Sequence, residues 1–273
     1  MDGKSAGVVL KKEGELARLV ISRPERMNVL QPGDLRLLWQ YMVTIEADER
    51  ARLVALEGEG EKAFCAGLDL STWAGADLAE MRKRAREASL VVNRLAELAL
   101  PKVALVRGVA AGLGLELCLA CDFILAEEGS RFGFPEVRLG LVPWMGGIRR
   151  LVGAVGEKRT TEMVLLGGMV DAGKAAEWGL VNEVVPRGGL ERALEKLLNG
   201  LLQGSKAAQL AAARALRSSR DGYAPFGLDQ ELESLVSCLA LGDGRERISD
   251  LLEKRAGGRT TGTGQEPGDG PDE

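Results

Sequence analysis

The chain has 273 residues, 45% of them hydrophobic, and its 36 Lys and Arg against 40 Asp and Glu give a net charge of −4. This hydrophobic content can supply a substantial core, and the absence of a basic surplus argues against nucleic acid as a partner. No histidine is present, which excludes Ser-His-Asp and Cys-His catalysis, histidine-ligated zinc and proton transfer by imidazole.

Charged residues interrupt every apolar run, so none reaches the roughly 20 residues of a membrane helix. The N-terminal sequence MDGKSAGVVLKKEG lacks the apolar centre of a signal peptide. We therefore expect a cytoplasmic protein with no membrane partner. The four cysteines, Cys65, Cys118, Cys121 and Cys238, are unevenly spaced and are expected to be reduced thiols.

Short apolar strands alternate with amphipathic helices in the first half of the chain. The expected strands cover residues 8–10, 16–21, 53–56, 103–106 and 123–126. The expected helices cover residues 34–49, 78–99 and the apolar segment 108–122. This alternation predicts an α/β fold in which helices cover the faces of the sheet.

The second half of the chain is mainly helical, and we expect only residues 180–185 to interrupt it as a strand. A long run rich in Leu, Ala, Arg and Glu extends over 190–216. The chain is therefore divided into a core domain over 1–195, a C-terminal helical region over 196–256 and a tail over 257–273. The tail is rich in Gly, Thr and acidic residues, so it cannot bury enough apolar area to order and is expected to be disordered.

Three signatures that would indicate other functions are weak. The sequence GLG at 112–114 resembles the start of a dinucleotide fingerprint, but Leu117 occupies its third glycine position. The run 168–174 resembles a phosphate loop, but Ala175 replaces the hydroxyl residue that would bind magnesium. The start of a helix is the simpler interpretation of this run. The Cys-x-x-Cys pair at 118–121 could join a zinc site, but within an apolar helix it is more often packing. No metal site is expected.

Glu116 is the lone carboxylate within the sequence GVAAGLGLELCLACD. Its helical neighbours Gly112, Leu113, Leu119 and Ala120 are small or apolar, so this face of the helix is expected to be dry. A carboxylate in such a place finds a partner, takes up a proton or lines a pocket. The alternative to a catalytic role is a structural one, in which the helix dipole stabilises the carboxylate. The residues alone leave both roles open.

A second carboxylate, Glu136, lies in the apolar loop sequence RFGFPEVRLG. Two carboxylates in such surroundings can exchange protons in a chain that has no histidine. The loop 64–69 is built from small residues that allow a ligand to approach main-chain N–H groups. Together with the amides at the start of the helix at 113–120, this loop is suited to bind an anionic carbonyl oxygen.

Six sequence blocks resemble, in order, the crotonase superfamily, the enoyl-CoA hydratase/isomerase group. They extend from about residue 8 to residue 255 and read ISRPERMNVL, EKAFCAGLDL, PKVALVRGVAAGLGLELCLACDF, FGFPEVRLGLVPWMGG, GKAAEWGLVNEVVP and LLEKR. The resemblance implies the crotonase (ClpP-like) fold, in which repeated ββα units form a layered sheet core that a C-terminal helical region follows. The reaction is less specified, because this fold hosts many acyl-CoA chemistries.

The resemblance also implies roles for individual residues. Leu68 and Leu113 match the residues whose N–H groups form the oxyanion hole for the thioester oxygen. Glu116 matches the glutamate that activates the water attacking C3, and Glu136 matches the glutamate that delivers a proton to C2. The residues expected to bind coenzyme A or substrate are Arg26, Asn28, Val29, Ala66, Gly67, Asp69, Leu70, Gly112 and Trp144.

Three bulky residues depart from the family pattern near this pocket. Leu113 stands where the family usually has glycine, and Trp144 and Met145 replace small residues. This bulk is expected to narrow the acyl slot or to exclude water. An aromatic residue that is common near Leu252 is also missing, which weakens the match for part of the coenzyme A site.

The expected function is that of an enoyl-CoA hydratase, a lyase that adds water across the double bond of a 2-enoyl-CoA. The alternatives are isomerisation, decarboxylation or thioester hydrolysis, which are favoured if Trp144 blocks water, or a non-catalytic acyl-CoA-binding member. No cofactor is expected, because coenzyme A is part of the substrate. The resemblance implies a homotrimer or a dimer of trimers.

Overall fold

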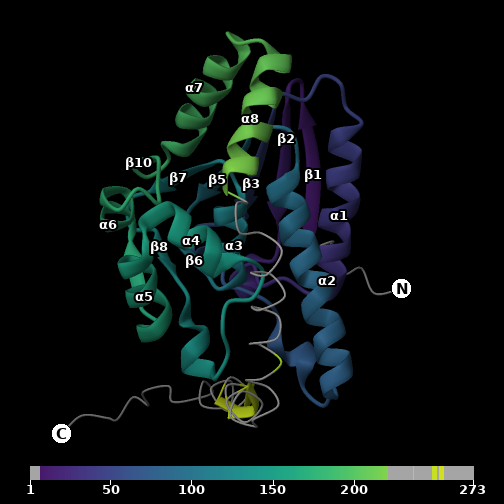
Figure 1. The fold of residues 1–273 in the computed structure, drawn as a ribbon, viewed down its shortest axis with the longest axis vertical. Coiled ribbons are helices and arrows are strands. Elements are labelled where there is room, and N and C mark those ends of the chain that lie inside the picture. The colour runs from purple at the N-terminus through teal and green to yellow at the C-terminus, as the bar shows by residue number, and fades with distance from the viewer. Residues whose placement is uncertain (1–6, 221–235, 237–247, 251, 255–273) are drawn as a thin grey trace, which may run out of the picture.

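The computed structural model describes residues 7–220, 236, 248–250 and 252–254. Within these residues, strands of two sheets lie together and helices cover them on several sides (Figure 1). The alternation of strands and helices confirms the predicted α/β class. No helix in this described part of the chain is long and apolar enough to span a membrane.

The larger sheet has six strands in the order β1-β2-β3-β5-β7-β10. The strands are β1 (Val8–Glu13), β2 (Leu16–Ile21), β3 (Leu53–Gly58), β5 (Lys102–Val106), β7 (Phe123–Glu127) and β10 (Glu183–Val185). The strands predicted over 8–10 and 16–21 form the antiparallel pair of β1 and β2, and every other neighbouring pair in this sheet is parallel. Parallel strands of this kind are stable when both faces of the sheet are covered.

Residues that alternate along each strand face two separate apolar layers. Leu53 of β3 belongs to a cluster with the buried side chains of α7 (Leu190–Leu202). Its neighbour Val54 belongs to the main core, to which α1 (Pro32–Glu46) and α2 (Leu78–Glu97) contribute. The sheet is therefore buried on both faces.

The smaller sheet has four strands in the order β4-β6-β8-β9. The strands are β4 (Ala63–Cys65), β6 (Val109–Ala111), β8 (Arg131–Gly133) and β9 (Met169–Asp171). All four strands correct the sequence-based prediction. β4 and β8 lie in segments expected to be loops, β6 lies within the helix expected over 108–122, and β9 lies in a region expected to have no strand outside 180–185. Strands of three residues are too short for a visible alternation, and their pairing with distant strands stabilises them.

The helix expected over 108–122 begins after β6, as α3 (Leu113–Ala120). Gly112 joins the strand to the helix with φ 55°, a left-handed conformation that favours glycine. A Cβ on Gly114 would lie 2.0 Å from the carbonyl oxygen of Cys65. Glycine at this position therefore allows the first turn of α3 to contact the end of β4.

The two long N-terminal helices lie close to the predicted ranges 34–49 and 78–99. At the start of α1, Gln31 and Asp34 form a reciprocal capping box, in which the Gln31 N–H donates to Asp34 at 2.7 Å. At the start of α2, Asp77 accepts a hydrogen bond of 2.8 Å from the Glu80 N–H. Side-chain caps thus fix where both helices begin.

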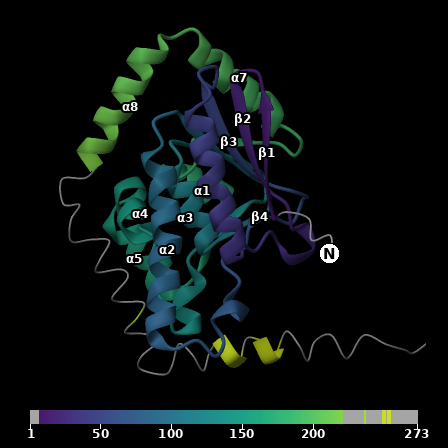
Figure 2. The same ribbon diagram turned by 90° about the vertical axis from the view of Figure 1, so that its right-hand side faces the viewer.

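The second half of the chain is mainly helical, as predicted. Its helices are α4 (Gly147–Val155), α5 (Glu157–Leu166), α6 (Ala172–Glu177), α7 and α8 (Lys206–Arg220). The run predicted over 190–216 is divided between α7 and α8, and Figure 2 shows α8 standing apart from the sheet layers. The predicted boundary after residue 195 falls inside α7, which packs on the sheet. The tail predicted over 257–273 and Cys238 lie outside the described residues.

Alanine at Gly114 tests the close approach of α3 to β4. The added Cβ collides with the Cys65 backbone, so we expect Gly114→Ala to lower the free energy of unfolding by about 1–3 kcal/mol in urea denaturation. Gly153→Ala is the matched control, because it lies in α4 and nothing is within 4 Å of an added Cβ. This control should raise stability by about 0.5–1 kcal/mol. Equal effects of the two substitutions would contradict the packing described.

Candidate active site

Glu116 lies in the first turn of α3 and is fully buried, as its apolar neighbours predicted. Its Oε1 accepts hydrogen bonds from the backbone N–H groups of Met145, at 2.7 Å, and Gly147, at 3.1 Å. Gly147 is the first residue of α4, so the carboxylate lies at the positive end of a second helix. These donors stabilise a negative charge on Glu116 at a place from which water is excluded.

Gly147 is required for this contact. A Cβ at this position would lie 2.7 Å from Oε1 of Glu116 and 2.8 Å from Cζ of Phe134. Any side chain would therefore separate α4 from the carboxylate. The only sequence signal for this close approach is the pair of glycines that follows Trp144 and Met145.

Glu136 lies in η3 (Pro135–Leu139) and is only 6% exposed. Its Oε2 has no hydrogen-bond partner among the described residues. Burial raises the pKa of this carboxyl group well above its usual value, and the nearby charge of Glu116 raises the pKa further. Both effects favour the neutral carboxylic acid, so Glu136 is suited to donate a proton.

The Glu136 carboxyl group lies against the start of α3. A Cβ on Gly112, the residue just before that helix, would be 3.0 Å from Oε1 of Glu136. Gly112 is itself fixed to β8, because its N–H donates to the Gly133 carbonyl at 3.1 Å. The structure thus brings both predicted carboxylates to the N-terminal turn of one short helix.

The predicted oxyanion hole uses the backbone N–H groups of Leu68 and Leu113. Leu68 forms a parallel bridge with Leu30, in which the Leu30 N–H donates to Gly67 and the Asp69 N–H donates to Leu30. These bonds do not use the Leu68 N–H, which has no hydrogen bond within the described part of the chain. Leu113 is the first residue of α3, so its N–H has no acceptor inside the helix.

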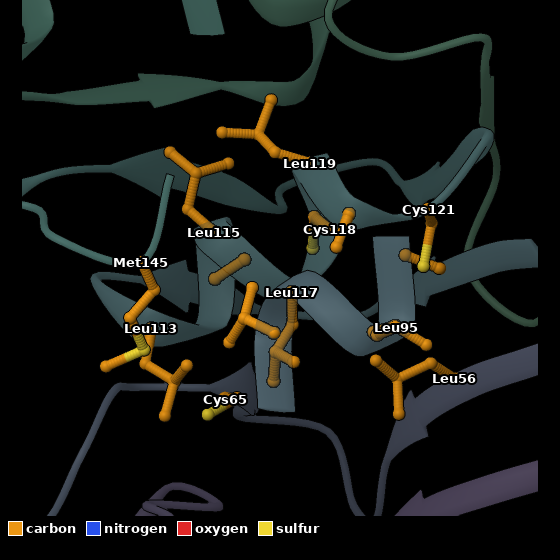
Figure 3. Packing of buried hydrophobic residues seen from close by; sticks show 14 of the residues in the cluster. Leu56, Cys65, Leu95, Leu113, Leu115, Leu117, Cys118, Leu119, Cys121 and Met145 are labelled. Atoms are coloured by element: carbon orange, nitrogen blue, oxygen red, sulfur yellow. The ribbon is translucent and has the colours of Figure 1, made fainter. Parts of the chain in front are cut away.

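The side chain of Leu113 is part of the hydrophobic core. It is 3% exposed and belongs to the same buried cluster as Cys65 and Met145 (Figure 3). The bulky Leu113 side chain, which departs from the family pattern, therefore packs among other apolar side chains. Its backbone N–H remains the first donor of α3, as the prediction for this residue requires.

Trp144 packs against a second tryptophan that sequence analysis missed. The rings of Trp144 and Trp73 have centroids 5.6 Å apart and are tilted by 60°. Trp73 ends η2 (Leu70–Trp73) and lines, with Leu68, a cavity of about 340 Å³. Trp73 thus lies between Trp144, which it contacts, and a cavity that it lines together with the predicted oxyanion residue. The only sequence signal for Trp73 was its place shortly after the block that contains Leu68.

The loop 26–29 is held by Asn28, which is fully buried. The Nδ2 of Asn28 donates to the carbonyls of Glu59 and Ala63, at 2.9 and 2.7 Å, and its Oδ1 accepts from the Arg23 N–H at 2.9 Å. All of its polar atoms are thus used by the backbone. Asn28 therefore fixes the shape of the loop, and its buried side chain is not available to a ligand.

Arg26 is the charged residue that this loop exposes. It belongs to η1 (Pro24–Arg26), and its Nη1 lies 3.2 Å from Oδ2 of the buried Asp69. Asp69 in turn accepts a 3.1 Å hydrogen bond from the Ser71 N–H and so caps η2. The ion pair therefore connects the loop 26–29 to the loop 66–70, the two regions predicted to hold coenzyme A. The other residues predicted there are buried (Val29, Gly67, Gly112) or partly buried (Ala66, Leu70).

The cysteines in the described part of the chain are buried free thiols. Burial raises the pKa of the Cys65 and Cys121 thiols to about 12, so these groups are neutral and unreactive. Cys118 and Cys121 belong to the main core, which confirms that the Cys-x-x-Cys pair is packing. Among the residues described, no group of three or more His, Cys, Asp or Glu is arranged to hold a metal ion.

Comparison with known proteins gives consistent matches over most of the chain. A family model described as enoyl-CoA hydratase/isomerase matches residues 11–258. A short-chain-enoyl-CoA hydratase of Clostridium acetobutylicum is 32% identical over 248 residues, which are 91% of this chain and 95% of that protein. A 2,3-dehydroadipyl-CoA hydratase of Escherichia coli is 34% identical over 249 residues, with 91% and 96% covered.

Comparison with solved structures identifies the same family. The crystal structure of an enoyl-CoA hydratase from Mycobacterium avium subsp. paratuberculosis superposes with a TM-score of 0.81 at 27% identity, and the match covers 90% of this chain and 99% of that one. This similarity confirms the predicted crotonase fold. The chain therefore belongs to the enoyl-CoA hydratase/isomerase family.

Proposed function

We propose that this chain is an enoyl-CoA hydratase, which adds water across the double bond of a 2-enoyl-CoA. The observation that carries the proposal is the pair of buried glutamates, of which Glu116 accepts two backbone N–H bonds and Glu136 has an unpartnered oxygen and a raised pKa. Relatives that are 31–34% identical and are named as hydratases of enoyl-CoA substrates support the same reaction.

In this proposal the thioester oxygen binds to the N–H groups of Leu68 and Leu113. Attack on C3 moves the electrons of the double bond toward the thioester, and the oxygen gains negative charge as an enolate. Donors that are already in place stabilise this charge, and the loss of one such donor typically costs about 2.7–4 kcal/mol of transition-state stabilisation. The start of α3 adds the positive end of its dipole.

The two glutamates divide the proton transfers. The Glu116 carboxylate accepts a proton from water while the remaining hydroxyl bonds to C3, and Glu136 donates its proton to C2. The protons gained and lost balance, so the return of one proton from Glu116 to Glu136, directly or through solvent, restores the enzyme. Coenzyme A remains part of the substrate, and this sequence of steps uses no metal or further cofactor.

A non-catalytic acyl-CoA-binding role accounts less well for Glu136. A buried carboxyl group without a full set of partners destabilises the fold, and an apolar residue of similar size would not. Such a cost is typical of residues that act on a substrate. The same argument supports proton transfer over binding alone.

We also propose that the chain works as a homotrimer or a dimer of trimers in the cytoplasm. Leu165 and Leu166 at the end of α5 are adjacent and are 68% and 67% exposed, which supports an assembly contact on this surface. Light scattering of the purified protein should give the mass of three or six chains. A monomer mass at micromolar concentration would contradict the proposed assembly.

The loss of conjugated-thioester absorbance with crotonyl-CoA tests the proposed reaction. The substitutions Glu116→Gln and Glu136→Gln each remove one proton transfer and should lower kcat by about 10²–10⁴-fold. Glu128→Gln is the matched control, because Glu128 is exposed and the side-chain replacement is the same. The proposal fails if the wild-type enzyme turns over no short or medium 2-enoyl-CoA, or if both glutamine variants keep full activity.

A further inference from the structure

Arg150, in the first turn of α4, binds the segment that supplies the hydrogen-bond donors to Glu116. Its Nη1 donates a 2.7 Å hydrogen bond to the carbonyl of Met145, and its backbone N–H donates to the carbonyl of Gly146 at 3.0 Å. Met145 is also the residue whose N–H donates to Oε1 of Glu116 at 2.7 Å. One arginine therefore binds two successive carbonyls of the segment that holds the carboxylate.

The peptide group between Gly146 and Gly147 is held on both sides. Its carbonyl oxygen accepts the hydrogen bond from the Arg150 N–H, and its own N–H donates to Oε1 of Glu116 at 3.1 Å. Because a peptide group is planar, a rotation that turns the carbonyl away from Arg150 also turns the N–H away from the carboxylate. The orientation of this segment toward Arg150 and its orientation toward Glu116 are therefore coupled.

The absence of a side chain at Gly146 leaves room for the guanidinium group. A Cβ at this position would lie 2.4 Å from Nη1 of Arg150 and 3.0 Å from its Cζ. Gly146 also has φ 89°, a left-handed conformation that favours glycine. The turn that leads into α4 is thus shaped so that the arginine side chain folds back over it and reaches the Met145 carbonyl.

The other arm of the guanidinium group binds α2. Nη2 of Arg150 donates to Oδ1 of Asn93. The Nδ2 of Asn93 in turn donates to the carbonyl of Ser89 at 2.8 Å and to its Oγ at 3.1 Å. Ser89 is buried, and Asn93 and Arg150 are partly buried. The bonds within α2 therefore orient the Asn93 amide so that its oxygen faces the arginine.

Arginine is suited to this position, because its planar guanidinium group directs separate N–H groups at two acceptors in a fixed geometry. Here the acceptors belong to different elements, since Asn93 lies in α2 and Met145 lies in the segment before α4. The segment is thus anchored to a helix outside itself. A lysine ammonium group keeps the charge but lacks the fixed fork.

Resting on the proposed hydratase function, we propose that Arg150 is a positioning residue for the catalytic base. By joining Asn93 to the carbonyl of Met145, it keeps the N–H groups of Met145 and Gly147 in the place from which they bind Glu116. Arg150 acts on the reaction through Glu116. A displacement of about 1 Å in such a group can cost about 10²-fold in rate, so loss of the anchor slows the proton transfer.

Hydration of crotonyl-CoA by variants of the anchor tests this role. Arg150→Met removes both side-chain bonds and should lower kcat by about 10–100-fold with little change in KM, because the misplaced group acts in the transition state. Arg150→Lys keeps the charge and should retain more activity than Arg150→Met. Asn93→Leu removes one acceptor and should lower kcat by about tenfold. It carries the test if Arg150→Met does not fold.

Arg52→Met is the matched control. Arg52 also donates to two backbone carbonyls and to a side-chain amide oxygen, that of Gln209, but these acceptors lie at the end of α7 and in α8. Its loss removes the same kinds of contact from another part of the fold, so kcat should remain that of wild type. Wild-type kcat in both Arg150→Met and Asn93→Leu overturns the proposal.

A double-mutant cycle separates positioning from a merely structural role. Arg150→Met should lower kcat in the wild-type background and leave it nearly unchanged in the Glu116→Gln background, because the base that Arg150 positions is then absent. An equal fold loss in the two backgrounds overturns the proposal, since that result shows an effect that does not pass through Glu116.

Hydrogen exchange keeps the proposal separate from the hydratase function, because it requires no turnover. Arg150→Met should speed the exchange of the Met145 and Gly147 amides by about tenfold or more, and Arg52→Met should leave it unchanged. If no enoyl-CoA reacts but this exchange is faster in Arg150→Met, the hydratase function fails and the positioning of the segment by Arg150 stands. Equal exchange of both amides in wild type and Arg150→Met overturns the positioning whether or not the enzyme is a hydratase.

Discussion

The hydrogen bonds from the N–H groups of Met145 and Gly147 to Glu116 are the contact on which the site depends. They join the first turn of α3 to the first turn of α4, and they provide donors for a carboxylate that is completely buried. Because the contact fixes α3, it also fixes the Leu113 N–H at the start of that helix. Close approach through Gly114 and Gly147 makes the arrangement possible, since a Cβ at either position would collide with its neighbours.

Glu136 differs from Glu116 in its surroundings more than in its position. Both are buried near the start of α3, but Oε1 of Glu116 accepts hydrogen bonds from the backbone N–H groups of Met145 and Gly147, whereas Glu136 lies beside the charge of Glu116. Burial and the neighbouring charge therefore raise the pKa of Glu136. In the proposed reaction this difference makes one group the base and the other the acid, with no histidine required.

The sequence predicted the parts of this arrangement that depend on local pattern. The apolar neighbours of Glu116 at helical spacing predicted its burial, and α1 and α2 were predicted within a few residues. The partners of Glu116 were not predictable in this way, because they lie 29 and 31 residues further along the chain. The same limit applies to the three-residue strands β6 and β9, and to the contact of Trp73 with Trp144, which depends on how distant segments pack.

Folding buries Glu136 in a place that favours its neutral form. Since the folded-state pKa is raised above the unfolded value of about 4.3, the contribution of Glu136 to stability is fully present below that value and is lost as the pH rises through the folded-state pKa. The most direct measurement is the free energy of unfolding of wild type and Glu136→Gln across pH. We predict that the variant gains stability relative to wild type with rising pH, by up to about 1.4 kcal/mol per pH unit. A difference that does not change with pH, or that falls, would contradict the account.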